Sequence, residues 1–155
     1  MPGSWLPQEH PNLTAHSCVL TSPKSNAYNC IAWAAGEITR WWWPASLRGI
    51  SYWPKGVPRE ETLAAFIAAF ATKGFAPCAD GSLQEGIEKV ALFAKQIGGL
   101  VIPTHAARQL ESGQWTSKMG SLEDIHHSTF NDVNGPIYGQ PVQFLARPRN
   151  QPPDS

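Results

Sequence analysis

The sequence has no excess of charge of either sign. Its 155 residues include 12 Lys and Arg and 12 Asp and Glu, so the formal net charge at neutral pH is zero. A balanced chain has no basic field to attract nucleic acid or an anionic membrane surface, and no acidic field to attract a cationic partner. We therefore expect neither nucleic acid nor a membrane as a partner, and binding must depend on shape and local chemistry.

Cysteines are few, and long apolar runs are missing. Cys18, Cys30 and Cys78 are an odd number without a close pair, which argues against a disulfide framework and for a free thiol in a reducing compartment. No run of eighteen apolar residues could cross a bilayer, and Met1–Trp5 does not begin a signal peptide. We expect a soluble cytoplasmic protein, which is compatible with delivery into another cell by a dedicated secretion system.

The chain length and the turn-forming residues predict one domain over residues 1–147. A chain of this size has room for a single substantial core. Residues 1–25 are rich in proline and polar residues, and we expect an irregular lead-in there, with strand character only at Ser17–Thr21. Residues 148–155 have the composition of a disordered tail.

Helical patterns precede strand patterns along the chain. A short helix is predicted from Cys30 to about Ile38, and a second one over Leu63–Gly74. From Lys89 onwards the pattern is that of an antiparallel meander with a hairpin at Glu111–Gln114. Helices first and strands later predict an α+β fold, in which N-terminal helices pack on an antiparallel sheet.

Aromatic residues gather between the two predicted helices. Trp41, Trp42 and Trp43 stand together, and Tyr52 and Trp53 follow after a short loop. We expect several of these side chains to pack inside, because an exposed patch of this size would be sticky, whereas a few could line a substrate groove.

The segment Ser25–Ala35 places Cys30 at the start of the first predicted helix. Asn29 can cap this helix, and the unpaired N–H groups of its first turn then point at the sulfur, which favours the thiolate. The alternative is a buried cysteine that behaves as a small hydrophobic residue. His105 follows on a predicted strand, and this order fits a thiol nucleophile and its base.

With Asn29-Cys30-Ile31-Ala32-Trp33-Ala34 at the helix and Thr104-His105 on a later strand, the chain resembles the papain-like superfamily of thiol hydrolases. Its cysteine segment is closer to the small bacterial and phage-associated domains of this superfamily than to the cathepsins. The resemblance covers roughly residues 26–120 and implies a papain-like core. It also implies a cysteine peptidase, in which a thiolate attacks an amide carbonyl and water releases the acyl-enzyme.

The same resemblance bears on substrate and partners. Amidase, deamidase and transglutaminase reactions share the acyl chemistry, and the sequence does not separate them from a peptidase. Domains of this layout include bacterial toxins and effectors. The resemblance therefore implies a protein or peptide substrate and is compatible with a cognate inhibitor or immunity protein.

The residue that orients His105 depends on the register of the predicted hairpin. With a three-residue loop that ends at Gly113 in the left-handed conformation, Ser117 lies diagonal to His105 on one face of the sheet. With a two-residue loop, Ser117 turns away and Asp124, beyond the strand, takes the role. The glycine favours Ser117, whereas a carboxylate is the stronger partner of an imidazolium and favours Asp124, so both are candidates.

Two further roles complete the predicted site. The backbone N–H of Cys30 and the side-chain amide of Asn26 are candidate donors to the oxyanion, although Asn26 also fits a plain turn. His126 and His127 cannot easily share a metal ion, because neighbours on an extended segment point to opposite sides. We expect no metal and no cofactor. The rival hypothesis is a non-catalytic protein-binding module that uses the Trp-rich residues 41–53, with Cys30 in the core.

Overall fold

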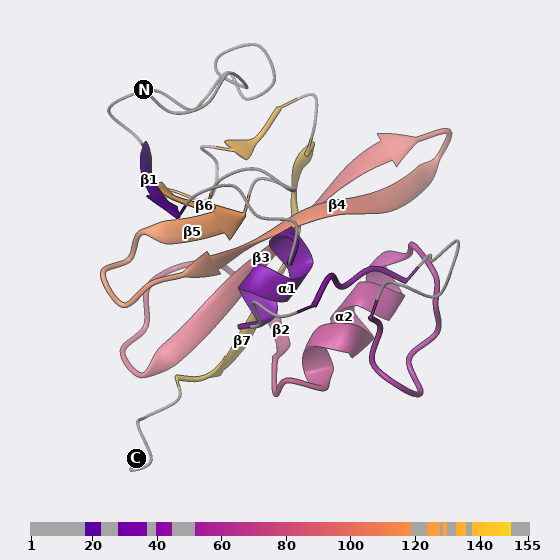
Figure 1. Cartoon of the computed structure of the whole chain (residues 1–155), viewed down its shortest axis with the longest axis horizontal. Coiled ribbons are helices and arrows are strands. Elements are labelled where there is room, and N and C mark those ends of the chain that lie inside the picture. The colour runs from indigo at the N-terminus through magenta and orange to yellow at the C-terminus, as the bar shows by residue number, and fades with distance from the viewer. Residues whose placement is uncertain are drawn as a thin grey trace.

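A seven-stranded antiparallel sheet forms the body of the molecule, with two short helices beside it (Figure 1). The computed structural model describes residues 18–22, 28–36, 40–44, 52–118, 124–127, 129, 133–135 and 138–149. The strand order across the sheet is β1-β6-β5-β4-β3-β7-β2. The strands are β1 (Cys18–Ser22), β2 (Ala76–Cys78), β3 (Ile87–Ile97), β4 (Leu100–Gln109), β5 (Trp115–Lys118), β6 (Asp124–His127) and β7 (Gln140–Pro148). The α+β class and the antiparallel sheet are as predicted.

The two helices begin and end at residues that cap them. The side chain of Asn29 accepts a hydrogen bond from the backbone N–H of Ala32 at 3.2 Å and starts α1 (Cys30–Ala35), as expected for this asparagine. The helix ends earlier than predicted because Gly36 adopts a left-handed conformation with φ of 92°. Thr62 caps α2 (Leu63–Ala71) in the same way as Asn29 caps α1.

Alternation along the central strands divides the buried side chains into two clusters. Val90 and Leu92 of β3 belong to the first cluster, together with residues of both helices, Ala106 of β4 and Leu145 of β7. Intervening positions of the same strands belong to the second cluster. Its members are Ala91, Phe93, Ala107, Trp115, Ile125, Val133 and Tyr138. The central sheet is therefore buried on both faces.

The aromatic segment contributes largely to the interior. Trp42 and Trp53 are 0% and 4% exposed and belong to the first cluster, while Trp43 and Tyr52 are half-buried against it. The expectation that several of these rings pack inside is confirmed.

The β4–β5 hairpin has the first of the two predicted registers. Arg108 pairs with Thr116, and the backbone N–H of Leu110 donates to Gln114 at 2.7 Å, which leaves a three-residue loop. Gly113 ends this loop with φ of 93°. The ladder between β4 and β5 stops at this pair, whereas β5 continues beside β6 as far as Lys118. The two strands therefore part on the side where the candidate site lies.

Strand β1 lies within the part that was expected to be irregular, at the stretch with strand character. The rest of residues 1–25 and residues 150–155 of the predicted tail lie outside the described residues. In the described part of the chain, neither helix has the length and apolar character needed to span a membrane.

Candidate active site

The start of α1 brings the sulfur of Cys30 against the backbone of β4. The Sγ atom lies 4.0 Å from the carbonyl oxygen of Thr104, at the limit of a thiol hydrogen bond. Backbone N–H groups of Ala106, Ile31 and Cys30 itself point at the sulfur. Cys30 therefore lies next to the backbone on both sides of His105.

The thiol of Cys30 is protonated in the resting structure. Burial raises its pKa to about 11, and this effect outweighs the N–H donors of Ala106, Ile31 and Cys30 and the positive charge of Lys118, all of which lower the pKa. The predicted N–H donors of the first helical turn are thus present. The expected preference for the thiolate is wrong for the resting state, because desolvation dominates.

His105 packs in the second cluster rather than beside the thiol in the first. Its ring is 1% exposed, stacks on Tyr138 with centroids 3.9 Å apart, and meets Phe93 edge-on at 5.4 Å. Cys30 belongs to the first cluster. The two residues thus approach the backbone of β4 from different clusters.

A chain of hydrogen bonds runs from His105 across three strands. The Nε2 atom of His105 lies 3.0 Å from Oγ of Ser117, which lies 2.8 Å from Nε2 of His127. The Nδ1 atom of His127 lies 2.7 Å from the carbonyl oxygen of Thr129. Ser117 and His127 are buried. We name this chain the histidine relay.

The carbonyl at the end of the histidine relay fixes the direction of each hydrogen bond. A carbonyl oxygen only accepts, so Nδ1 of His127 carries the proton and Nε2 of a neutral His127 must accept. The hydroxyl of Ser117 therefore donates to His127, and its oxygen accepts from Nε2–H of His105. The lone pair of a neutral His105 is consequently at Nδ1.

The structure describes the side chains of some of the remaining predicted site residues but not of others. The hairpin register brings Ser117 to His105, as the three-residue loop predicts. Asp124 begins β6 opposite Lys118, but its side chain is outside the described part, as is all of Asn26. Both stay predictions.

His126 and His127 differ in their surroundings. His126 is half-buried, and burial together with the positive charge of Arg108 lowers its pKa. His127 belongs to the histidine relay. No group of three His, Cys, Asp or Glu side chains gathers for a metal ion within the described ranges.

Sequence reasoning missed His127 as a member of the site. Its partner Ser117 was identified, but the segment that follows β5 carries only four residues of strand. In β6 the apolar Ile125 alternates with polar neighbours and pairs with Ser117, while His127 pairs with Trp115. The alternation around Ile125 was the available signal for a strand that places His127 on the face of Ser117.

Two surface hollows lie away from these residues. One, of about 440 Å³, is lined by Leu83, Gln84, Glu85, Gly86, Glu111 and Arg149. The other, of about 510 Å³, is lined by Ala94, Lys95, Gln96, Gly135, Gly139, Gln140 and Val142. Neither lining includes Cys30, His105 or Ser117. A ligand in either hollow would therefore not touch the sulfur directly.

Family models place most of the chain in one family. Residues 19–146 match a family described as a domain of unknown function (DUF7689), and the chain belongs to it. No curated protein and no solved structure matches the chain. The match extends from β1 to β7 and so includes Cys30, His105, Ser117 and His127.

Proposed function

We propose that this member of the DUF7689 family is a papain-like cysteine hydrolase that cleaves a peptide or amide bond. Cys30 is the nucleophile, His105 its base and Ser117 the residue that orients the base. The observation that carries the proposal is the histidine relay, because Ser117 contacts Nε2 of His105 and can orient the imidazole as the sequence predicts. The position of Cys30 beside Thr104 and Ala106 supports the same assignment.

The proposed reaction proceeds through an acyl-enzyme. Because Cys30 lies in the first cluster and His105 packs on Tyr138 in the second, the imidazole must first turn towards the sulfur. The thiol proton of Cys30 then passes to Nδ1 of His105, and the sulfur attacks the carbonyl carbon to form a C–S bond. Backbone N–H groups at the start of α1 stabilise the oxyanion, with the amide of Asn26 as the second proposed donor. The C–N bond then breaks as the imidazolium protonates the leaving amine. Water, deprotonated by His105, releases the acyl group and restores the thiol.

The buried thiol makes proton transfer costly before substrate binds. Burial raises the pKa of the Cys30 thiol to about 11, so loss of its proton is unfavourable while the site is closed to water. Attraction between the charges and the approach of the substrate must offset this cost. The proposed enzyme therefore forms its thiolate during substrate binding and has no stable ion pair at rest.

The burial of Cys30 favours a second candidate, a non-catalytic protein-binding module. A cysteine that is 6% exposed fits an ordinary core position as well as a resting nucleophile. The Trp-rich segment offers this module less surface than its composition suggests, because Trp42 and Trp53 are buried. The histidine relay is compatible with both candidates, because it does not include Cys30, and the Cys30→Ala comparison decides between them.

Substrate and partners are proposed on the resemblance alone. A peptidase would take a protein or peptide, and a toxin or effector of this kind would be paired with an inhibitor protein. Deamidase and transglutaminase reactions use the same Cys30 and His105, and differ in whether water or an amine accepts the acyl group.

Comparison of wild type with Cys30→Ala tests the hydrolase. Each protein is incubated with a proteome and with a cell-wall digest, and new termini and deamidated or amine-linked products are identified by mass spectrometry. We expect products with wild type and with Cys78→Ala, a matched change of the half-buried Cys78, but not with Cys30→Ala. Methylamine as an added acceptor separates transfer from hydrolysis. Identical product profiles for wild type and Cys30→Ala would favour the binding module.

A further inference from the structure

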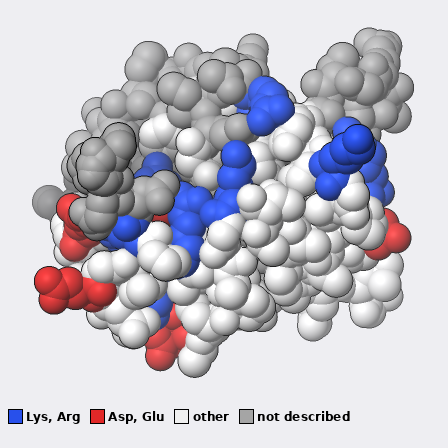
Figure 2. Space-filling view, turned by 90° about the horizontal axis from the view of Figure 1, so that it is seen from below, with Lys and Arg blue, Asp and Glu red and all other residues white. Residues whose placement is uncertain are grey.

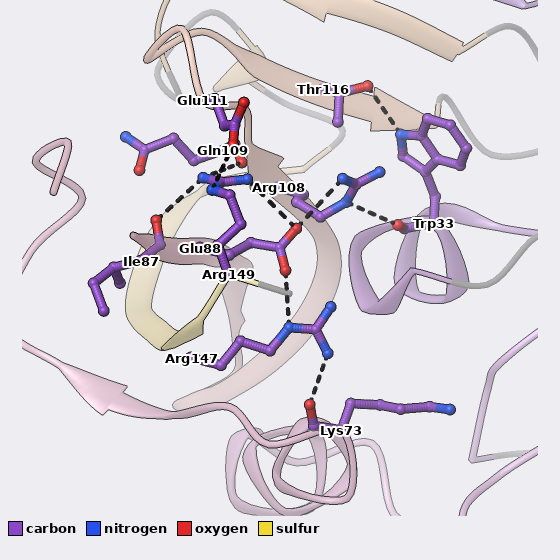
Figure 3. Close-up of polar contacts among 10 residues, drawn as sticks. All are labelled: Trp33, Lys73, Ile87, Glu88, Arg108, Gln109, Glu111, Thr116, Arg147 and Arg149. Atoms are coloured by element: carbon purple, nitrogen blue, oxygen red, sulfur yellow. Dashed lines mark hydrogen bonds and ion pairs between the residues drawn. The ribbon is translucent and has the colours of Figure 1, made fainter. Parts of the chain in front are cut away.

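Three arginines converge on one buried carboxylate between the sheet and the helices (Figure 3). Glu88 of β3 has a side chain that is 8% exposed. Its Oε1 lies 2.8 Å from Nε of Arg147, and its Oε2 lies 3.4 Å from Nη1 of Arg108 and 4.0 Å from Nη1 of Arg149. We name these four residues the Glu88 cluster.

Two arginines of the Glu88 cluster also reach the C-terminal ends of the helices. Nε of Arg108 donates to the carbonyl oxygen of Trp33 at 3.4 Å, and Nη1 of Arg147 donates to that of Lys73 at 2.7 Å. Cations at helix C-termini are favourable, because the last carbonyl groups carry partial negative charge. One role of the cluster is therefore to hold α1 and α2 to the sheet.

Positive charge in the Glu88 cluster exceeds the negative charge around it. Three guanidinium groups face one buried carboxylate, and the two helix ends supply at most about half a charge each. Arg149 also lies 4.0 Å from the exposed carboxylate of Glu111. About one positive charge is left over only when the exposed Glu111 is not counted. Burial lowers the pKa of Arg108, and the charges of Arg147 and Arg149 lower it further against the opposing effect of Glu88.

One guanidinium nitrogen of Arg108 and one of Arg147 are available to another ligand. Within the described ranges, Nη2 of each makes no hydrogen bond, and neither atom is among the buried polar atoms without a partner. The two side chains are 19% and 15% exposed, so these nitrogens face solvent. In Figure 3 both guanidinium groups extend past the carboxylate of Glu88 towards α1.

Gly36 lies beside Nη2 of Arg147. Gly36 follows α1, and a Cβ atom at this position would come within 3.6 Å of Nη2 of Arg147. Figure 2 shows Lys and Arg side chains in a band over the face seen from below, with Asp and Glu mainly near its margins.

We propose that Arg108 and Arg147 form a binding site for a small oxyanion, of the phosphate or carboxylate type, beside the C-terminal end of α1. Guanidinium groups suit this ligand because their parallel N–H donors match two oxygens of one anion. Glu88 holds both groups in place and competes with the ligand for their charge. The affinity is accordingly weak, with a dissociation constant on the order of 1 mM. The site does not depend on the proposed hydrolase activity.

Titration of the full chain with inorganic phosphate and, separately, with succinate tests the site at constant ionic strength set by chloride. The readout is the NMR titration of His126, because burial and the positive charge of Arg108 lower the pKa of this histidine and a bound anion offsets the charge of Arg108. We expect saturable shifts and a higher His126 pKa. A response to phosphate alone identifies a site for phosphate-type anions, and a response to succinate alone identifies a site for carboxylates. Shifts no larger than those with chloride for both ligands would overturn the proposal.

Arg147→Lys and Lys95→Gln locate the binding. Arg147→Lys keeps the charge but loses the paired donors, and we expect affinity to fall about tenfold. Lys95→Gln removes a charge on β3, seven positions along the strand from Glu88, and affinity should not change. Unaltered affinity in folded Arg147→Lys would contradict the proposal. If that variant does not fold, the wild-type His126 titration decides alone.

Discussion

The Nε2 atom of His105 lies 3.0 Å from the hydroxyl oxygen of Ser117, on the strand that the β4–β5 hairpin folds back beside it. This contact depends on the three-residue loop, because a shift by one residue would turn Ser117 to the opposite face. The length of the hairpin loop therefore determines which nitrogen of the neutral His105 imidazole carries the proton.

Ser117→Ala should impair both folding and the proposed chemistry. The change leaves Nε2 atoms of His105 and His127 without the hydroxyl between them, which costs about 1–3 kcal/mol in free energy of unfolding. It also removes the acceptor that keeps the proton on Nε2 of His105, so the rate of hydrolysis should fall at least about tenfold. Urea denaturation and ¹⁵N NMR of the imidazoles measure the two effects. Ser117→Thr should restore the tautomer, and Ser112→Ala in the exposed loop is the matched control.

Cys30 should react slowly with iodoacetamide at neutral pH. Its pKa of about 11, against a reference value of 9.0, reduces the thiolate fraction about a hundredfold relative to the unfolded chain. The labelling rate, followed by peptide mass spectrometry, should rise about tenfold per pH unit up to that pKa. Labelling that persists below pH 7 and drops in His105→Ala would show instead that an ion pair exists at rest.

The same shift predicts a loss of stability in alkali. Between 9.0 and about 11 the unfolded chain has released the Cys30 proton while the native state keeps it, so the unfolded state binds fewer protons. The stabilising contribution is therefore complete below pH 9 and is lost as the pH rises through the native pKa. As the pH rises from below 9.0 to above about 11, we expect the free energy of unfolding to fall by about 3 kcal/mol more for wild type than for Cys30→Ala. Parallel curves for the two proteins would contradict the assigned burial effect.

Local signals in the sequence identified several parts of the fold and the candidate site. Asn29 was recognisable as a helix cap because asparagine is a preferred residue immediately before the first turn of a helix. Gly113 indicated the loop type, and with it the position of Ser117, because a left-handed residue is needed at the end of a three-residue hairpin loop.

Other features depend on contacts between residues that are far apart in the sequence, which a local sequence pattern does not reveal. The pKa of Cys30 is set by burial against β4, which is distant in sequence. His127 joins the relay only because β6 pairs with β5, and its short strand gave a weak signal. The Glu88 cluster joins β3, β4 and β7, and charges that meet across three strands are not visible as a run in the sequence.

Gly113→Ala should destabilise the hairpin that sets the Ser117 register. A Cβ at this residue is strained because its φ is 93°, and it would also meet Leu83 at 3.4 Å. The expected loss is about 1–2 kcal/mol in free energy of unfolding, measured by urea denaturation. Gln114→Ala, one residue later and exposed, should change stability by less than about 0.5 kcal/mol. Equal effects of the two changes would mean that the left-handed residue does not fix the loop.

Glu88→Gln should cost more stability than any exposed charge change, because it leaves three guanidinium groups without their shared carboxylate. Arg108, Arg147 and Arg149 are each less than one-fifth exposed, so water replaces the lost partner only in part. Removing one partner of a largely buried ion pair costs about 3 kcal/mol. Glu85→Gln, at an exposed position two residues before the start of β3, is the matched control.

The proposed oxyanion site adds a second outcome: phosphate should stabilise Glu88→Gln more than wild type, because the ligand no longer competes with Glu88. Thermal unfolding with phosphate against chloride at equal ionic strength measures the difference, and equal stabilisation of both proteins would separate the Glu88 cluster from anion binding.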